Sequence, residues 1–139
     1  MPDLQAIAIL LCLLAFVAVD GWVQGGITAR NRLYIPASEQ PAINTDLHLL
    51  APLLYTLLLL TLWLLAGWVW PVAGVLLRGG LFDPIMNIRR RDPLFFVGTS
   101  AQLDRLLRTL AGSRADILSA GLRVVALLAG GAVLLVHYR

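Results

Sequence analysis

The sequence predicts an all-α integral membrane protein with three transmembrane helices and a cytoplasmic loop that contains short interfacial amphipathic helices. Three long apolar runs predict this class: Ala6 to Val19, Leu49 to Leu77 and Ile117 to Val136. The composition agrees, because 59% of the 139 residues are hydrophobic and only 14% are charged, whereas about a quarter of the residues in soluble domains are charged. We expect residues 1–139 to form a single membrane domain.

The lengths of the runs define the expected spans. A hydrocarbon core of about 30 Å needs about 20 helical residues. The first run reaches this length when its neighbours are included, which gives a helix over about 4–23. The other two runs predict helices over 48–77 and 117–136. The second is too long to stand upright, at about 43 Å, so we expect a kink or tilt near Gly67 to Pro71.

The arginines predict an orientation. The loop 78–115 contains seven arginines, and the stretch from Gln24 to Leu47 contains only Arg30 and Arg32. Because arginine-rich short loops stay in the cytoplasm, the loop 78–115 is expected to be cytoplasmic. With three spans, the N-terminus is then cytoplasmic and the C-terminus external, and a bacterial inner membrane is the expected location.

The loop 78–115 carries two helix signals. Asp83-Pro84 is typical of a helix start, so a short helix is expected from Pro84 to Arg90 or Arg91, ended by Asp92-Pro93. Thr99 and Gln102 have capping-box spacing, and leucines follow at 103, 106, 107 and 110. Such a helix suits a membrane interface or packs on the bundle. The residues expected to contact lipid or a partner are Arg89, Arg90, Arg91, Arg105, Arg108, Phe95 and Phe96.

Two side chains inside the apolar runs need separate explanations. Arg123 lies about 10 Å along the helix from Asp116, so its side chain is expected to extend back to the headgroups. An ion pair inside the bundle is the alternative. Cys12 is the single cysteine of the chain, and we interpret it as a small core residue, with a lipid-exposed thiol as the alternative.

A metal or haem site is a second hypothesis. With three spans, Asp20, His48 and His137 share the external boundary. Carboxylate and imidazole ligands suit a divalent metal, and two imidazoles suit haem. No H-E-x-x-H or comparable ligand spacing supports such a site, so no cofactor belongs to the leading interpretation.

A resemblance covers residues 82–106. Phe82-Asp83, Asn87, Val97-Gly98-Thr99-Ser100 and Asp104-Arg105-Leu106 resemble a pattern in small uncharacterised multi-helix membrane proteins of bacteria and their phages. The resemblance implies that this loop is a recurrent module. It implies no activity and no cofactor.

The leading functional expectation is a non-enzymatic accessory or assembly subunit of a larger membrane complex. Its expected partners are the bilayer with its anionic headgroups, and other membrane subunits or further copies of the chain, with Ala126 and Gly130 available for helix packing. Nucleic acid is not an expected partner, because the arginines lie between apolar helices. The alternatives are a membrane-embedded enzyme or redox subunit that uses the metal or haem site, and a phage holin-like pore former.

Overall fold

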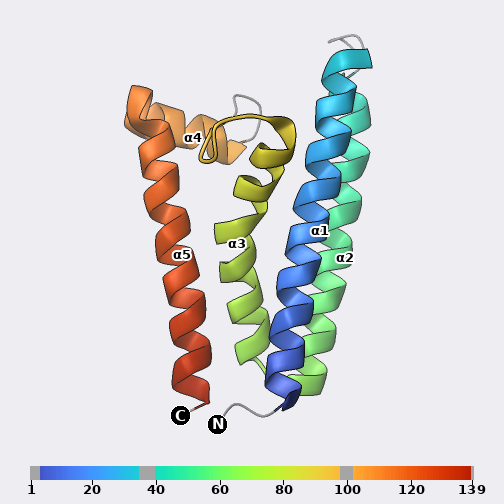
Figure 1. Ribbon diagram of the computed structural model, residues 1–139, viewed down its shortest axis with the longest axis vertical. Helices are drawn as coiled ribbons and strands as arrows, with labels where there is room; N and C mark the ends of the chain where they lie inside the picture. Colours follow the sequence, from blue (N-terminus) through green and yellow to red (C-terminus); the bar gives the residue numbers. More distant parts are fainter. Residues whose placement is uncertain (1–3, 35–39, 98–101, 139) are drawn as a thin grey trace.

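The protein is a bundle of long helices with one short helix across its end (Figure 1). The computed structural model describes residues 4–34, 40–97 and 102–138, with side chains for 4–34, 50–97 and 104–138. The elements are, in order, α1 (Leu4–Tyr34), α2 (Gln40–Ala66), α3 (Val69–Arg90), α4 (Gln102–Ala111), the 3₁₀ turn η1 (Gly112–Arg114) and α5 (Ala115–His137). The all-helical class predicted from the sequence is confirmed.

Three of the described helical stretches are long and apolar enough to cross a membrane: Leu4–Tyr34, Val69–Arg90 and Asp104–His137. A shorter apolar stretch, Leu50–Ala66, lies in α2. α5 matches the helix predicted over 117–136 within two residues at each end. α1 starts where predicted but continues to Tyr34, well beyond residue 23.

The predicted single helix over 48–77 is wrong, because the second apolar run forms a turn between two helices. α2 ends at Ala66, α3 begins at Val69, and Gly67 between them has a φ of +91°. Only glycine adopts this region of backbone space readily. The Gly67 amide donates to the Trp63 carbonyl at 3.0 Å, which closes the end of α2. The chain therefore reverses where a kink was expected.

α3 also extends further than predicted. The helix start expected at Asp83-Pro84 is wrong, since Pro84 lies buried inside α3, which continues to Arg90. The Asp83 carboxylate contacts Arg123 of α5 at 2.7 Å. The local sequence assigns the Asp83 carboxylate to helix capping, but in the structure it pairs with Arg123 on another helix.

α3 is the central helix, with α1 and α2 on one side and α5 on the other (Figure 1). Small residues allow the close approach of these helices. A Cβ on Gly21 of α1 would lie 2.9 Å from the Phe82 carbonyl oxygen, and one on Gly25 would lie 2.7 Å from the Met86 carbonyl oxygen. On the other side, Gly130 of α5 lies against Leu76 and Leu77. Gly130 thus packs within the chain.

The two ends of the bundle differ. α1 begins and α5 ends at the lower end in Figure 1, where Trp70, Leu13 and Ala6 form a buried apolar cluster. The Trp70 ring also lies 6.0 Å from the Tyr138 ring. The other end is crossed by α4. The start of α1 and the end of α5 therefore lie at the same end of the bundle. The predicted cytoplasmic N-terminus and external C-terminus depended on the single helix over 48–77, and the side of a membrane on which each end lies stays a prediction.

Candidate functional site

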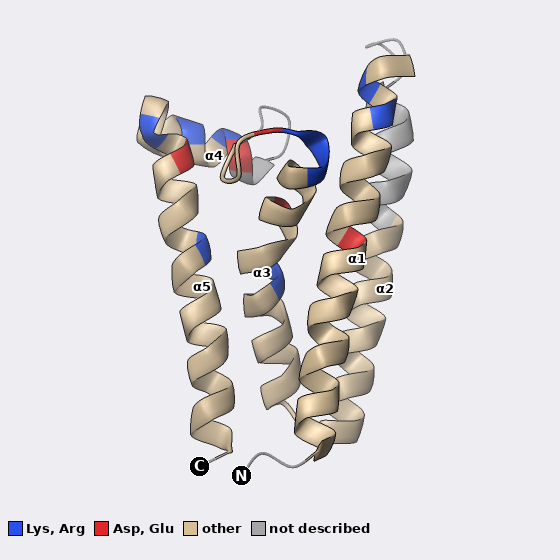
Figure 2. Cartoon of the chain, viewed as in Figure 1, with Lys and Arg blue, Asp and Glu red and all other residues tan. Residues whose placement is uncertain are grey.

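Arginine residues, blue in Figure 2, gather at the end of the bundle that carries α4. They come from the last turns of α1 and α3, from the loop after α3, and from α4 and η1: Arg30, Arg32, Arg89, Arg90, Arg91, Arg105, Arg108 and Arg114. We call this set the arginine end. The two remaining described arginines, Arg78 and Arg123, lie within the bundle and form ion pairs.

The arginine end is shaped by a sharp stop of α3. Arg91 takes the left-handed conformation, with a φ of +61°, and its amide donates to the Ile88 carbonyl at 3.1 Å. The Asp92 amide donates to the Asn87 carbonyl at 3.0 Å. These bonds satisfy carbonyls that a helix end would otherwise leave open. The stop predicted at Asp92-Pro93 is therefore confirmed.

Asn87 holds the loop that follows. Its side chain is 2% exposed, and its amide nitrogen donates to the carbonyls of Leu94 and Phe96, both at 3.1 Å. Buried polar groups that are fully bonded fix one backbone arrangement. Asn87, which belongs to the pattern resembling the phage and bacterial proteins, is therefore a structural residue of the loop.

The same loop packs against α4 and the start of α5. Val97 is fully buried with Leu107 and Ala115. The Val97 amide donates to the Asp116 carboxylate at 2.9 Å, and Arg108 donates to the Val97 carbonyl. The helix predicted after Gln102 is present as α4, whereas Thr99 of the predicted capping box lies outside the described residues.

Asp92 joins α1 to the end of α3. Its carboxylate contacts Arg90 at 3.0 Å and Arg32 at 3.3 Å. One carboxylate therefore serves two guanidinium groups. Arg89 instead lies over the Trp22 ring, with 4.8 Å between its guanidinium carbon and the ring centroid.

Two ion pairs lie deeper in the bundle. Arg123 is 7% exposed, contacts Asp83 at 2.7 Å, and donates from Nε to the Ser119 hydroxyl at 2.8 Å. The expectation that Arg123 extends to the headgroups is wrong, and the alternative of an ion pair inside the bundle is what the structure contains.

The second pair joins α1 to α3. Arg78 donates to the Asp20 carboxylate, which also accepts from the Gln24 side chain at 2.7 Å. The guanidinium carbon lies 4.6 Å from the Tyr55 ring centroid and 4.1 Å from that of Phe82. The two rings and the carboxylate together compensate the Arg78 charge within the bundle.

The residues of the metal hypothesis are separated. Asp20 contacts Arg78 and Gln24 within the bundle, while His137 is in the last turn of α5, beside the Tyr138 ring at 4.9 Å. His48 is in the half of α2 nearer the arginine end, and its side chain lies outside the described set. Among the described side chains, no three of His, Cys, Asp and Glu converge on a metal position.

The predicted contact residues lie together at the arginine end. Phe95 and Phe96 are half-buried, and Arg108 lies 5.8 Å from the Phe96 ring centroid. On α4, Leu107 is buried, whereas Leu106 is 53% and Leu110 70% exposed. The leucine stripe is thus divided between bundle packing and an open face.

No protein-family model, curated protein or solved structure matches the chain.

Sequence reasoning missed two features that position the arginine end. Gly21 and Gly25 have the four-residue spacing typical of close helix contacts, and this signal was available in the sequence. The pairing of Asp20 with Arg78 could not be predicted from the sequence. It depends on the chain reversal that brings α3 alongside α1, and the continuous apolar run over 49–77 gives no clear sign of that reversal.

Proposed function

We propose that this chain is a non-enzymatic integral membrane protein that crosses a bilayer four times and serves as an accessory subunit, with its arginine end at the cytoplasmic surface. The observation that carries the proposal is the contrast between an apolar shaft and one arginine-rich end (Figure 2). Positive charge held on one side is the main determinant of membrane orientation.

The outer surface of the shaft suits lipid. Large apolar side chains are open on α2 and α5, among them Leu64 at 77%, Leu65 at 75%, Leu128 at 68% and Val136 at 75% exposure. Soluble monomers rarely expose apolar patches that continue along whole helices. Lipid tails would cover these side chains at no cost, because they are equally apolar.

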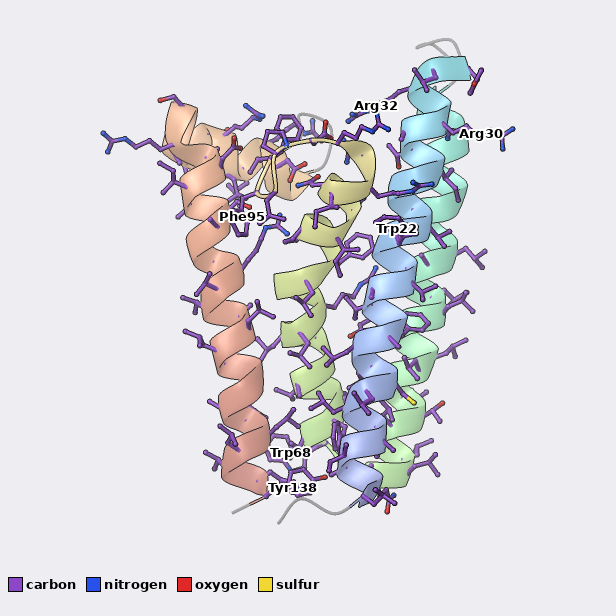
Figure 3. The ribbon with its side chains drawn as sticks, viewed as in Figure 1. Trp22, Arg30, Arg32, Trp68, Phe95 and Tyr138 are labelled. Carbon is purple, nitrogen blue, oxygen red and sulfur yellow. The ribbon has the colours of Figure 1, made fainter. Side chains whose placement is uncertain are left out.

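The dimensions of the shaft suit a bilayer. α3 has 22 residues, about 33 Å at the helical rise, close to the hydrocarbon thickness of about 30 Å. Trp68 and Tyr138 lie at one end of the shaft, and Trp22 lies towards the arginine end (Figure 3). Tryptophan and tyrosine favour the two headgroup boundaries, so these rings would mark both surfaces of the membrane.

The polar groups inside the shaft support a structural role. Asp20 is paired with Arg78, and Asp83 is paired with Arg123. Groups that satisfy one another hold helices in register, whereas a transport path or catalytic site needs polar groups directed at a substrate. The open face of α4, with Leu106 and Leu110, provides a surface for the membrane interface or a partner subunit.

Reporter fusions test the crossing number and the orientation. A reporter that is active only outside the cytoplasm should be active at both ends of the chain and inactive when inserted between α1 and α2. Activity at the C-terminal end alone would support three crossings and contradict the proposal.

Purification in mild detergent tests the accessory role. Mass spectrometry of the purified protein should identify defined membrane subunits that are retained through a second purification step. A stoichiometric metal or a haem absorbance band in the same sample would contradict a non-enzymatic protein and favour the redox alternative.

A further inference from the structure

A pocket of about 540 Å³ lies between the C-terminal ends of α1 and α3. Pockets of several hundred Å³ are the usual size of small-ligand sites. The lining includes no acidic residue among the described side chains, and five of its nine residues are arginine: Arg30, Arg32, Arg89, Arg90 and Arg91. We call this the arginine pocket.

The arginine pocket has a fixed wall. Gly25 brings α1 against α3, since a Cβ there would lie 2.9 Å from the Arg89 Cβ. The next residue, Gly26, leaves room for the Arg89 side chain, whose Nε would lie 3.2 Å from a Cβ at that position. The Trp22 ring supports the same guanidinium. Arg89 is therefore held across the face of α1 in a defined position.

The positive charge of the pocket is only partly balanced. Asp92 is shared between Arg32 and Arg90, and the Nε of Arg90 is buried without a hydrogen-bond partner among the described residues. Five arginines line the pocket, and the Arg30 side chain is directed away from the bundle (Figure 3). Asp92 and the half-charges at two helix C-termini offset part of this charge, and the carboxylates of Asp83 and Asp104 also act on Arg90, so the pocket remains net positive.

We propose that the arginine pocket binds a phosphate monoester group. A dianionic phosphate complements the net positive lining better than a monoanion, and arginine forms paired hydrogen bonds with phosphate oxygens. The inference rests on the proposed membrane orientation for one point: that orientation places the pocket at headgroup level, where a phosphatidic acid headgroup would reach it. Free phosphate shares the same chemistry and is the other source.

The test uses the full chain in phosphatidylcholine nanodiscs. Phosphatidic acid is titrated in, and its retention is measured by native mass spectrometry, with phosphatidylglycerol, a phosphodiester, for comparison. The variant Arg89→Gln/Arg91→Gln removes two pocket charges that have no ion-pair partner among the described side chains. The matched control, Arg105→Gln/Arg114→Gln, removes two charges from α4 and η1 outside the pocket.

The pocket variant should lose affinity for phosphatidic acid by about tenfold or more, since charge-assisted bonds are the strong ones, while the control should stay within about twofold. Equal losses in both variants would mean diffuse attraction to charge and would overturn the pocket. Equal retention of phosphatidic acid and phosphatidylglycerol by the unaltered chain would overturn the monoester assignment.

A second arm separates the two sources and the two proposals. Inorganic phosphate at millimolar concentration should not displace phosphatidic acid from the unaltered chain. If it does displace the lipid, and the pocket variant does not show this effect, the pocket is a site for soluble phosphate and not for the lipid. A chain that inserts with four crossings but binds neither ligand overturns the pocket alone. A chain that fails to insert overturns the proposed function, and phosphate binding in detergent then still decides the pocket.

Discussion

Asp20 and Arg78 form the ion pair that links α1 to α3 within the bundle. Their ion pair lies in the apolar shaft, with side chains 12% and 18% exposed, and the Tyr55 and Phe82 rings lie beside it. In such a place each charge is tolerated only because the other is present. Arg32 and Asp92 provide a contrast, because the Arg32 side chain is 43% exposed.

Substitution of Asp20 by leucine should lower the free energy of unfolding by about 3–5 kcal/mol, because it leaves the Arg78 charge buried without its partner. The double variant Asp20→Leu/Arg78→Met should regain most of this loss. The measurement is reversible unfolding in detergent micelles.

The control is Arg32→Met, which breaks an exposed ion pair and should cost less than about 1 kcal/mol. A double variant no more stable than Asp20→Leu alone would show that the pair contributes through packing or position and not through charge compensation.

At the residue scale, sequence reasoning identified the polar side chains but not their partners. Arg123 and Asp83 both received local explanations, and the ion pair between them depends on α3 continuing past Pro84 to lie beside α5. Tertiary contacts between residues 40 positions apart in the sequence leave no local signal.

At the scale of elements, the Gly21 and Gly25 pair sets the distance between α1 and α3. Alanine at Gly25 would place a Cβ 2.7 Å from the Met86 carbonyl oxygen and 2.9 Å from the Arg89 Cβ. Backbone and Cβ atoms cannot move aside as a flexible side-chain tip can, so the helices must separate. Such overpacking typically costs about 1–3 kcal/mol.

Gly25→Ala should therefore lower the thermal midpoint in detergent and also loosen the arginine pocket, since Gly25 lies beside its wall. Gly79→Ala is the matched control, because a Cβ on Gly79 of α3 meets nothing within 4 Å. The control should be neutral or slightly stabilising, as alanine favours helix over glycine. Equal midpoints for the two variants would argue against a close contact at Gly25.

The predictable elements are those whose local signals agree. α5 was predicted over 117–136 and runs from Ala115 to His137, because its apolar pattern is unbroken, and the amphipathic helix expected from the leucines at 103, 106, 107 and 110 is present as α4. The reversal at Gly67 was not predicted as such, since a single glycine in a leucine-rich run favours a kink as readily as a turn. As a result, the structure has two helices, α2 and α3, where one helix over 48–77 was predicted.

At the scale of the whole molecule, that reversal changes the face on which each end of the chain is expected. In this fold the start of α1 and the end of α5 lie at one end of the bundle, and the arginines of the arginine end lie at the other (Figure 2). With three passes, Arg30 and Arg32 would lie on the opposite side of the membrane from the arginines of the loop 78–115. The four-pass arrangement therefore agrees better with the bias that orients membrane proteins.

Cys12 tests the depth of the shaft in the unaltered chain. Its side chain is exposed on α1, so the expectation of a core residue is wrong, and the alternative of a lipid-exposed thiol stays a prediction. It lies eight residues after Leu4, about 12 Å along the helix, where a bilayer around the shaft would cover it. A membrane-impermeant maleimide should leave Cys12 unmodified in cells and in inside-out vesicles, and should label it after unfolding in detergent.

The positive control for this labelling is Cys12→Ser/Arg114→Cys, which moves the thiol to an exposed position at the arginine end. This variant should react in inside-out vesicles and stay unmodified in intact cells. Labelling of Cys12 in intact membranes at the rate of the Arg114→Cys thiol would place α1 in water. The exposed leucines and valines of the shaft would then need a protein partner to cover them in place of lipid.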